Sequence, residues 1–202
     1  MSSLRHTPEP RLDAYLDAAR DCILDVGWRR TTLTEVAKRA GVSRMTMYRA
    51  WPDMGSLLGD LMTREWVGIA AATRVAATDT TTPDGIAAAA LSTVRALRDN
   101  ELFVRIVELD PDLMLPYLLS RRGRSQEALI EILAAEIESG QRSGAIRAGD
   151  AVLMARSLTL AGHGFVFSAM TMTDAEVGLE QLDQEYARLV TSSLAPSGLA
   201  PS

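Results

Sequence analysis

Apolar and polar residues alternate with the period of an α-helix along almost the whole chain. In residues 12–26, apolar side chains recur every three or four positions: Leu12, Tyr15, Leu16, Ala19, Cys22, Ile23 and Val26. This spacing lines one face of a helix, and Gly27 supplies a residue at which such a helix ends. No segment of useful length shows the strict alternation of a β-strand. We therefore expect an all-α chain.

Two short helices with a tight turn between them are predicted next. Thr32 and Glu35 have the spacing of a capping box, in which a hydroxyl and a carboxylate satisfy the first amides of a helix. Gly41 supplies the left-handed residue that a tight turn needs. Ser43 is a favourable N-cap for the following helix, which spans residues 44–50. Residues 32–50 thus read as a helix-turn-helix.

The rest of the chain predicts further helices separated by short breaks. A fourth helix begins near residue 53 and continues past Trp66, and residues 77–83 form a loop. The later helices are expected at residues 84–98, 101–109, 112–119, 123–141, 149–170 and 174–194. The total is nine or ten helices, in a chain long enough to bury a substantial core.

Composition excludes several classes of protein. The 202 residues contain one Cys and two His, so a disulfide framework and a zinc finger are ruled out. The chain carries no signal-peptide pattern and no apolar run long enough to span a membrane, which favours the cytoplasm. No phosphate-binding loop, nucleophile elbow or metal-binding cluster is present. We expect no enzyme activity, no cofactor, no metal and no membrane partner.

The distribution of charge changes the first impression of an acidic protein. The whole chain has a net charge of −5, which disfavours a nucleic-acid partner. Residues 28–52 nevertheless contain six basic residues and one acidic residue, a net charge of +5, and the remainder carries −10. The positive charge therefore coincides with the predicted helix-turn-helix, where a phosphate backbone would lie.

The helix-turn-helix resembles a known family. Residues 31–52, TTLTEVAKRAGVSRMTMYRAWP, are similar to the DNA-binding signature of the TetR/AcrR transcriptional regulators, and the resemblance covers residues 11–66. It implies a three-helix DNA-binding domain over residues 1–66, with residues 44–50 as its recognition helix. It also implies a larger helical domain for effector binding and dimerisation over residues 67–195. Residues 196–202 are expected to form a flexible tail.

The resemblance also implies which residues contact double-stranded DNA. They are Thr32, Thr34, Ser43, Arg44, Met45, Thr46, Tyr48 and Arg49. Arg44, Met45 and Thr46 match positions that face base edges, and Tyr48 matches an aromatic residue that contacts phosphate. Arg44 is the best base reader by chemistry, because its guanidinium can bind guanine bidentately. Met54 departs from the family, which usually has a phosphate-binding Lys there.

The family arrangement further implies a homodimeric repressor that binds a palindromic operator and is released by a small-molecule effector. Candidate effector-binding residues are Trp66, Phe103, Met114, Tyr117, His163 and Phe167. Candidate dimer-interface residues are Leu153, Leu160, Phe165, Leu182, Tyr186 and Leu189. At helical spacing, the same side chains also fit simple core packing.

Three other interpretations remain open from the sequence. The helix-turn-helix pattern also occurs in ordinary pairs of buried helices. The chain could be a small all-helical ligand carrier or enzyme without DNA binding, although it has no catalytic motif. It could also bind DNA without responding to an effector, in which case its C-terminal core would be filled.

Overall fold

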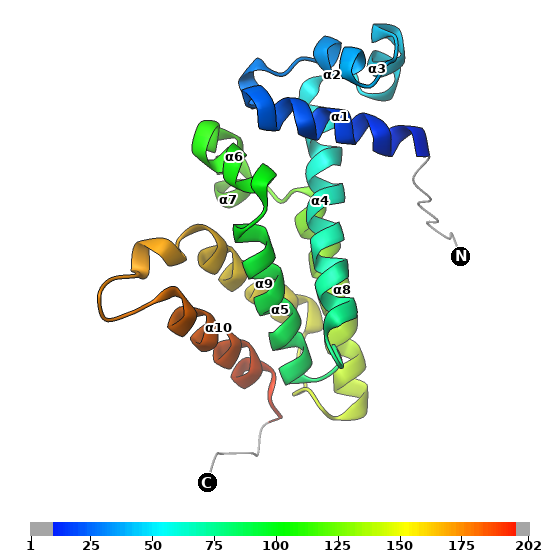
Figure 1. Cartoon of the computed structure of the whole chain (residues 1–202). Coiled ribbons are helices and arrows are strands. Elements are labelled where there is room, and N and C mark those ends of the chain that lie inside the picture. Colours follow the sequence, from blue (N-terminus) through cyan, green and yellow to red (C-terminus); the bar gives the residue numbers. More distant parts are fainter. Residues whose placement is uncertain (1–9, 197–202) are drawn as a thin grey trace. The chain divides into compact units, whose positions relative to one another are not determined.

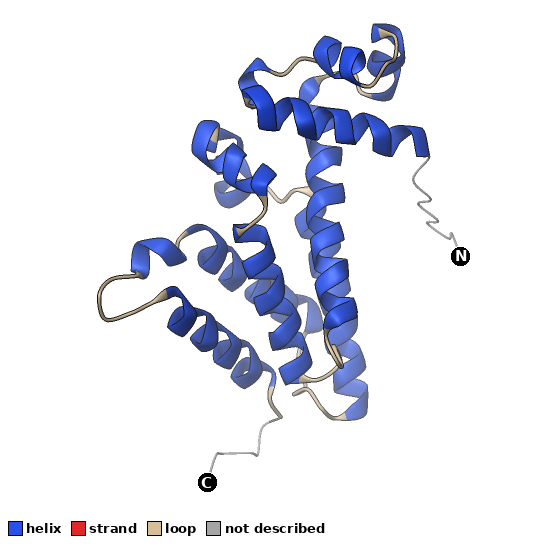
Figure 2. Ribbon diagram, viewed as in Figure 1, coloured by secondary structure: helices blue, strands red, loops and turns tan. Residues whose placement is uncertain are grey.

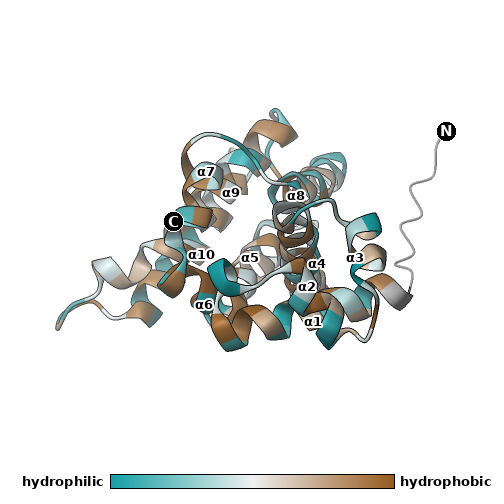
Figure 3. Ribbon diagram, turned by 90° about the horizontal axis from the view of Figure 1, so that it is seen from above, coloured by the Kyte–Doolittle hydropathy of each residue, from teal (hydrophilic) through white to brown (hydrophobic). Residues whose placement is uncertain are grey.

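The computed structural model describes residues 10–196, and within that range the chain forms ten α-helices, three short 3-10 helices and no strand (Figures 1 and 2). The all-α expectation is confirmed. Hydrophobic and hydrophilic residues alternate around the helices, as expected for amphipathic elements (Figure 3). Of the predicted tail at residues 196–202, only Pro196 lies among the described residues.

The helices have the following bounds. The α-helices are α1 (Pro10–Val26), α2 (Leu33–Arg39), α3 (Arg44–Ala50), α4 (Met54–Ala76), α5 (Pro83–Arg98), α6 (Glu101–Leu109), α7 (Leu115–Leu119), α8 (Arg124–Ser143), α9 (Ala151–Phe167) and α10 (Leu179–Leu194). The 3-10 helices are η1 (Trp28–Arg30), η2 (Pro111–Leu113) and η3 (Ala169–Met172).

Three predicted helices differ clearly from the observed ones. The helix expected at residues 149–170 ends at Phe167 and is followed by η3. The single helix expected at residues 112–119 is divided into η2 and α7, because Pro116 lacks the N–H group that a continuous helix would require at that position. The last helix begins at Leu179 and not at residue 174. Asp174 instead closes a turn, since its carboxylate accepts the amides of Glu176 and Val177, each at 2.8 Å.

One compact unit combines the described residues up to Arg64 with residues 101–121. Within it, α1 packs against both α2 and α6, and α2 packs against α3. Its fully buried side chains on α1 to α4 include Ile23, Val36, Met47, Leu57 and Leu61. Trp51 is buried as well, and its indole N–H donates to the carboxylate of Asp60 at 2.7 Å.

The second unit holds residues 65–100 and the described residues from Arg122 onward. In this unit α5 packs against α9 and α10, and α8 packs against α9. Their core contains Ile86, Val94, Ile137, Leu158 and Tyr186, with Phe165 against its edge. The boundary between the units falls inside the continuous helix α4. The expected functional division into residues 1–66 and 67–195 remains a prediction.

A charged cluster joins α5 to α10 inside the second unit. Asp183 on α10 is only 4% exposed, and its carboxylate meets Arg95 Nε and Arg98 Nη2, each at 2.6 Å. The bond to Asp183 raises the pKa of the Arg95 guanidinium. Because a buried carboxylate is costly without partners, the two arginines make this position tolerable.

Candidate nucleic-acid interface

The turn between α2 and α3 is a Schellman motif closed by Gly41. Gly41 has a φ of 68°, in the left-handed region that residues with a Cβ adopt at a cost. Its N–H donates to the carbonyl of Lys38 at 3.3 Å, and the N–H of Val42 donates to the carbonyl of Ala37 at 3.0 Å. This pair of bonds satisfies the last carbonyls of α2. The expected left-handed glycine is confirmed.

The start of α2 is a complete capping box, as the sequence predicts. The N–H of Glu35 donates to Thr32 Oγ1 at 3.2 Å, and the N–H of Thr32 donates to the Glu35 carboxylate at 2.9 Å. The Thr32 hydroxyl donates to the same carboxylate oxygen at 2.9 Å. A phosphate contact from Thr32 therefore requires its hydroxyl to leave Glu35.

The start of α3 is capped by Ser43. Its hydroxyl accepts the N–H of Thr46 at 3.1 Å and lies 2.8 Å from the Thr46 hydroxyl. Both hydroxyl groups therefore already have a partner within the protein. These bonds hold the first turn of α3 in a fixed conformation. That turn carries Arg44, Met45 and Thr46, the residues expected to face base edges.

The side chains of α3 divide between an exposed face and a buried one. Met47 is fully buried within the first unit, whereas Met45 is 69% exposed and Tyr48 is 46% exposed. Arg44 and Arg49 are exposed too, while Thr34 and Thr46 are half-buried. The helix thus offers two guanidinium groups, a phenol and a thioether to a partner.

Ion pairs distinguish the basic residues around the helix-turn-helix. Arg39 binds the carboxylate of Asp25 on α1, and this bond raises the pKa of the Arg39 guanidinium. Arg29 is paired with two carboxylates of residues 110–112. Arg44 and Arg49, by contrast, form no ion pair within residues 10–196. The cations on α3 are therefore available to a polyanion.

The candidate effector residues fall in both units. Phe103, Met114 and Tyr117 belong to the unit that contains α1, and the first two are buried. Trp66, His163 and Phe167 belong to the other unit and are half-buried. His163 and Phe167 meet edge to face with ring centroids 6.3 Å apart, and His163 Nε2 lies 3.4 Å from the amide nitrogen of Gln126.

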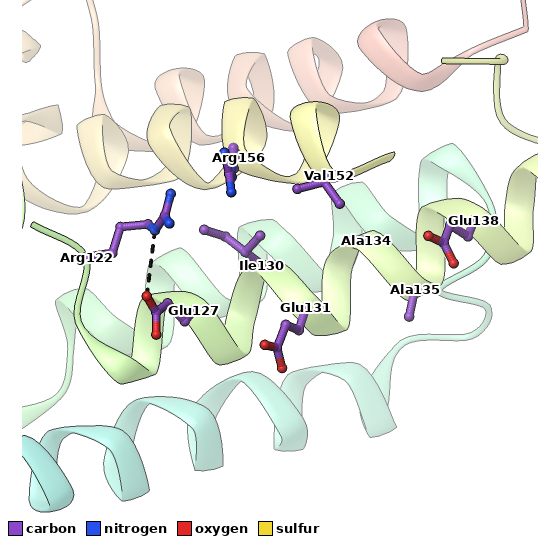
Figure 4. Close-up of a pocket in the computed structure, with 9 residues that line it drawn as sticks. All are labelled: Arg122, Glu127, Ile130, Glu131, Ala134, Ala135, Glu138, Val152 and Arg156. Carbon is purple, nitrogen blue, oxygen red and sulfur yellow. Dashed lines mark ion pairs between the residues drawn. The ribbon is translucent and has the colours of Figure 1, made fainter. Parts of the chain in front are cut away.

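A groove of about 420 Å³ lies along α8 and α9, and none of the six candidate effector residues lines it (Figure 4). The lining residues are Arg122, Glu127, Ile130, Glu131, Ala134, Ala135, Glu138, Val152 and Arg156. Arg122 and Glu127 pair across one end at 4.0 Å. Sequence reasoning missed this groove, because its carboxylates have the spacing of an ordinary solvated helix face.

The candidate dimer residues fall into three groups by exposure. Leu153 and Leu160 on α9 are 63% and 71% exposed, and Leu189 on α10 is exposed as well. Leu182 and Phe165 are half-buried. Tyr186 is buried in the core of its own unit, where its ring centroid lies 4.5 Å from that of Phe165.

The stability of the second unit is expected to depend on pH through His163. Burial lowers the pKa of its imidazole below the ordinary value of about 6.5. The unfolded chain therefore takes up the proton first as the pH falls, so stability is lost from the unfolded pKa down to the folded one. We expect the melting temperature of His163→Gln to fall less between about pH 7 and pH 5 than that of the wild type. Equal falls in the two proteins would contradict the expectation.

Two general features of the described residues bear on function. Every helix in residues 10–196 is too short or too polar to traverse a lipid bilayer. In the same range, no group of three or more His, Cys, Asp or Glu side chains is arranged to hold a metal ion.

Comparison with known proteins decides the family. Residues 16–61 match the family model described as bacterial regulatory proteins of the tetR family. An uncharacterised HTH-type transcriptional regulator of Mycobacterium bovis is 37% identical over 154 residues, which are 76% of this chain and 79% of the relative. The chain belongs to the TetR family of bacterial transcriptional regulators. The helix-turn-helix of residues 32–50 is thus a DNA-binding element, and a plain pair of buried helices is excluded.

Solved structures of TetR-family proteins share the fold over nearly the whole chain. The repressor QsdR of R. erythropolis superposes with a TM-score of 0.70 at 14% identity, covering 95% of this chain and 98% of QsdR. SmeT of Stenotrophomonas maltophilia, in complex with triclosan, superposes with a TM-score of 0.58 at 19% identity, covering 96% of each chain.

The start of α4 differs from the usual TetR pattern. Met54, the first residue of α4, occupies the position where the family usually has a Lys. The preceding Asp53 accepts the N–H of Ser56 at 2.7 Å, and this bond lowers the pKa of its carboxyl group. An apolar side chain thus stands where a cation is usual, and a carboxylate directly precedes it.

Proposed function

We propose that this TetR-family regulator is a homodimeric repressor that binds a palindromic operator and is released by a small apolar effector. The observation that carries the proposal is the exposed face of α3. Arg44, Met45, Tyr48 and Arg49 are all exposed on this seven-residue helix, and Met47 anchors it from the opposite side. A rigid helix with exposed cations and a phenol suits the major groove of DNA.

Dimerisation is supported by the outer face of α9. Leu153 and Leu160 are seven residues apart, so they lie on one side of the helix, and each is more than half exposed. Leu189 adds an exposed leucine on α10. A second copy of the chain would bury these side chains, and a two-fold dimer matches a palindrome with half-sites about 34–36 Å apart.

Release by an effector is supported by a structural neighbour. SmeT, a repressor with the same fold, has been solved with triclosan bound. In the present chain, Trp66, Phe103, Met114, Tyr117, His163 and Phe167 remain the proposed effector contacts. We place the protein in the cytoplasm, where bacterial operators lie, and assign it no catalytic step. A carrier or enzyme without DNA binding is not favoured, because the family is one of transcriptional regulators.

The test begins with selection of bound duplexes from a random-sequence DNA library by the purified full chain. We expect a palindrome whose half-sites are about 10 base pairs, or a multiple of that distance, apart. Binding to the recovered operator should weaken with salt by about 0.9 log unit per log unit of salt for each phosphate contacted. Adding triclosan and other small apolar compounds then tests release. Recovery of no enriched palindrome would contradict the proposed operator binding, and binding unaffected by every compound would contradict release.

Arg44→Ala tests the assignment of base readout. We expect operator affinity to fall by about 1–3 kcal/mol and the preference for guanine at one position to relax, because the bidentate contact is lost. Arg49→Ala is the matched control, since a backbone contact should weaken binding to all sequences about equally. An Arg44→Ala variant with unchanged sequence preference would remove Arg44 from the base-reading residues.

A further inference from the structure

Residues 101–121 belong to the unit that contains α1 to α3, although the chain on both sides of them belongs to the second unit. The helices on either side of this segment, α5 and α8, lie in the second unit. The segment itself belongs to the unit that contains the helix-turn-helix, and its helix α6 packs against α1. We call the unit that contains the helix-turn-helix, residues 10–64 and 101–121, the DNA-binding head. The chain connects the second unit to this head through the 21-residue stretch as well as through α4.

The most buried charged group of this segment is Asp110, which is 3% exposed. One of its carboxylate oxygens accepts the backbone N–H of Trp28 at 3.0 Å. The other pairs with Arg29 Nε at 3.1 Å, while Arg29 Nη2 reaches the exposed Asp112 at 2.8 Å. Two donors from the turn between α1 and α2 thus converge on one buried carboxylate. We call this arrangement the Asp110 clamp.

The turn held by the Asp110 clamp sets the direction of the chain between α1 and α2. Gly27 has a φ of 83°, and a Cβ added to it would lie 3.1 Å from a methyl carbon of Leu109. The Thr31 hydroxyl donates to the carbonyl of Gly27 at 2.8 Å, which closes the turn internally. The next residue, Thr32, is the N-cap of α2. The clamp therefore fixes the residues immediately before the helix-turn-helix.

We propose that Asp110 is a positioning residue for DNA binding, which holds the turn of residues 27–31 so that α2 and α3 meet the duplex in the correct orientation. The inference rests on the proposed operator binding. The expected change in DNA affinity has the opposite direction to a simple charge effect, because removal of an acidic group ordinarily strengthens binding to a polyanion. Loss of this particular acid is expected to weaken it.

Asp110→Asn is the variant that tests the clamp. Asparagine offers one acceptor and one donor where two donors converge, so one of the two bonds must be lost. We expect affinity for the selected operator to fall at least about tenfold, which corresponds to about 1.4 kcal/mol. The dependence of affinity on salt should keep its slope, since the phosphate contacts themselves are retained. Amide hydrogen exchange in residues 28–31 should become faster.

Glu108→Gln is the matched control, because it removes an exposed acid two residues away on α6. It should leave affinity equal or slightly higher. Arg29→Lys is the second variant, which preserves net charge but loses the Nε bond. It should weaken binding as Asp110→Asn does, and it keeps the test open if Asp110→Asn fails to fold.

Two results would overturn the proposal. If Asp110→Asn and Glu108→Gln strengthened operator binding equally, Asp110 would act only through its negative charge and not as a positioning residue. A salt slope steeper by about 0.9 in Asp110→Asn would mean that Arg29, once released, binds a phosphate. If the wild type binds no duplex, the proposed function fails, and hydrogen exchange then decides separately. Faster exchange of residues 28–31 in Asp110→Asn still supports the clamp, and unchanged exchange overturns it.

Discussion

Asp183→Ala is expected to lower the free energy of unfolding by about 3–5 kcal/mol, the usual cost of removing one partner from a buried ion pair. Arg98 is 11% exposed and lies 2.6 Å from Asp183, so the variant leaves a guanidinium in the protein interior without its carboxylate. The same substitution removes the bond that ties α5 to α10 through Arg95. Urea unfolding followed by circular dichroism measures the effect.

Glu180→Ala is the control for this prediction. Glu180 lies on the same helix and reaches Arg95 at 3.6 Å, but its side chain is 75% exposed. An exposed pair contributes little, so a change of less than about 1 kcal/mol is expected. Asp183→Ala and Glu180→Ala variants of equal stability would contradict the structural role given to Asp183.

Met47→Ala is expected to destabilise the DNA-binding head by about 2–5 kcal/mol, since it opens a cavity beneath a fully buried side chain. Thermal unfolding monitored by tryptophan fluorescence is suitable, because Trp28 and Trp51 both lie in the unit that contains Met47. Operator affinity should fall with stability as the temperature rises, because α3 is no longer held against the head.

Met45→Ala is a closely matched control, two residues away on the same helix. Met45 is largely exposed, so its loss should leave the unfolding transition almost unchanged. Any effect of Met45→Ala on operator affinity then reports a contact with DNA. If Met45→Ala destabilised the head as much as Met47→Ala, the observed orientation of α3 would be wrong.

Local chemistry explains which elements could be predicted from the sequence. The capping box of Thr32 and Glu35, the left-handed Gly41 and the N-cap Ser43 each depend on residues within three or four positions of one another. Such short-range bonds leave a recognisable pattern. The start of α3 at Arg44 follows directly from the Ser43 cap. The family signature added the expected contacts with DNA, which remain predictions.

Long-range contacts explain what the sequence did not reveal. Asp110 and Arg29 are separated by 81 positions, and Asp183 and Arg98 by 85. No periodicity connects such residues, and Asp110 alone indicates only a helix end before Pro111. The division between η2 and α7 was not predicted either. A proline such as Pro116 is found both in the first turn of a helix and where a helix is interrupted, so the sequence alone does not separate the two cases.

The packing of α6 against α1 has a consequence for the order in which the protein matures during synthesis. The ribosome releases α1 to α3 long before residues 101–121, yet α1 and the carboxylate at Asp110 meet only after the later segment has emerged. The N-terminal helices therefore complete their tertiary structure through contacts that are distant in sequence, which slows folding relative to a helical bundle with local contacts alone. A nascent chain that stalls before residue 110 carries all the residues expected to read DNA but lacks the carboxylate that closes the turn beside them.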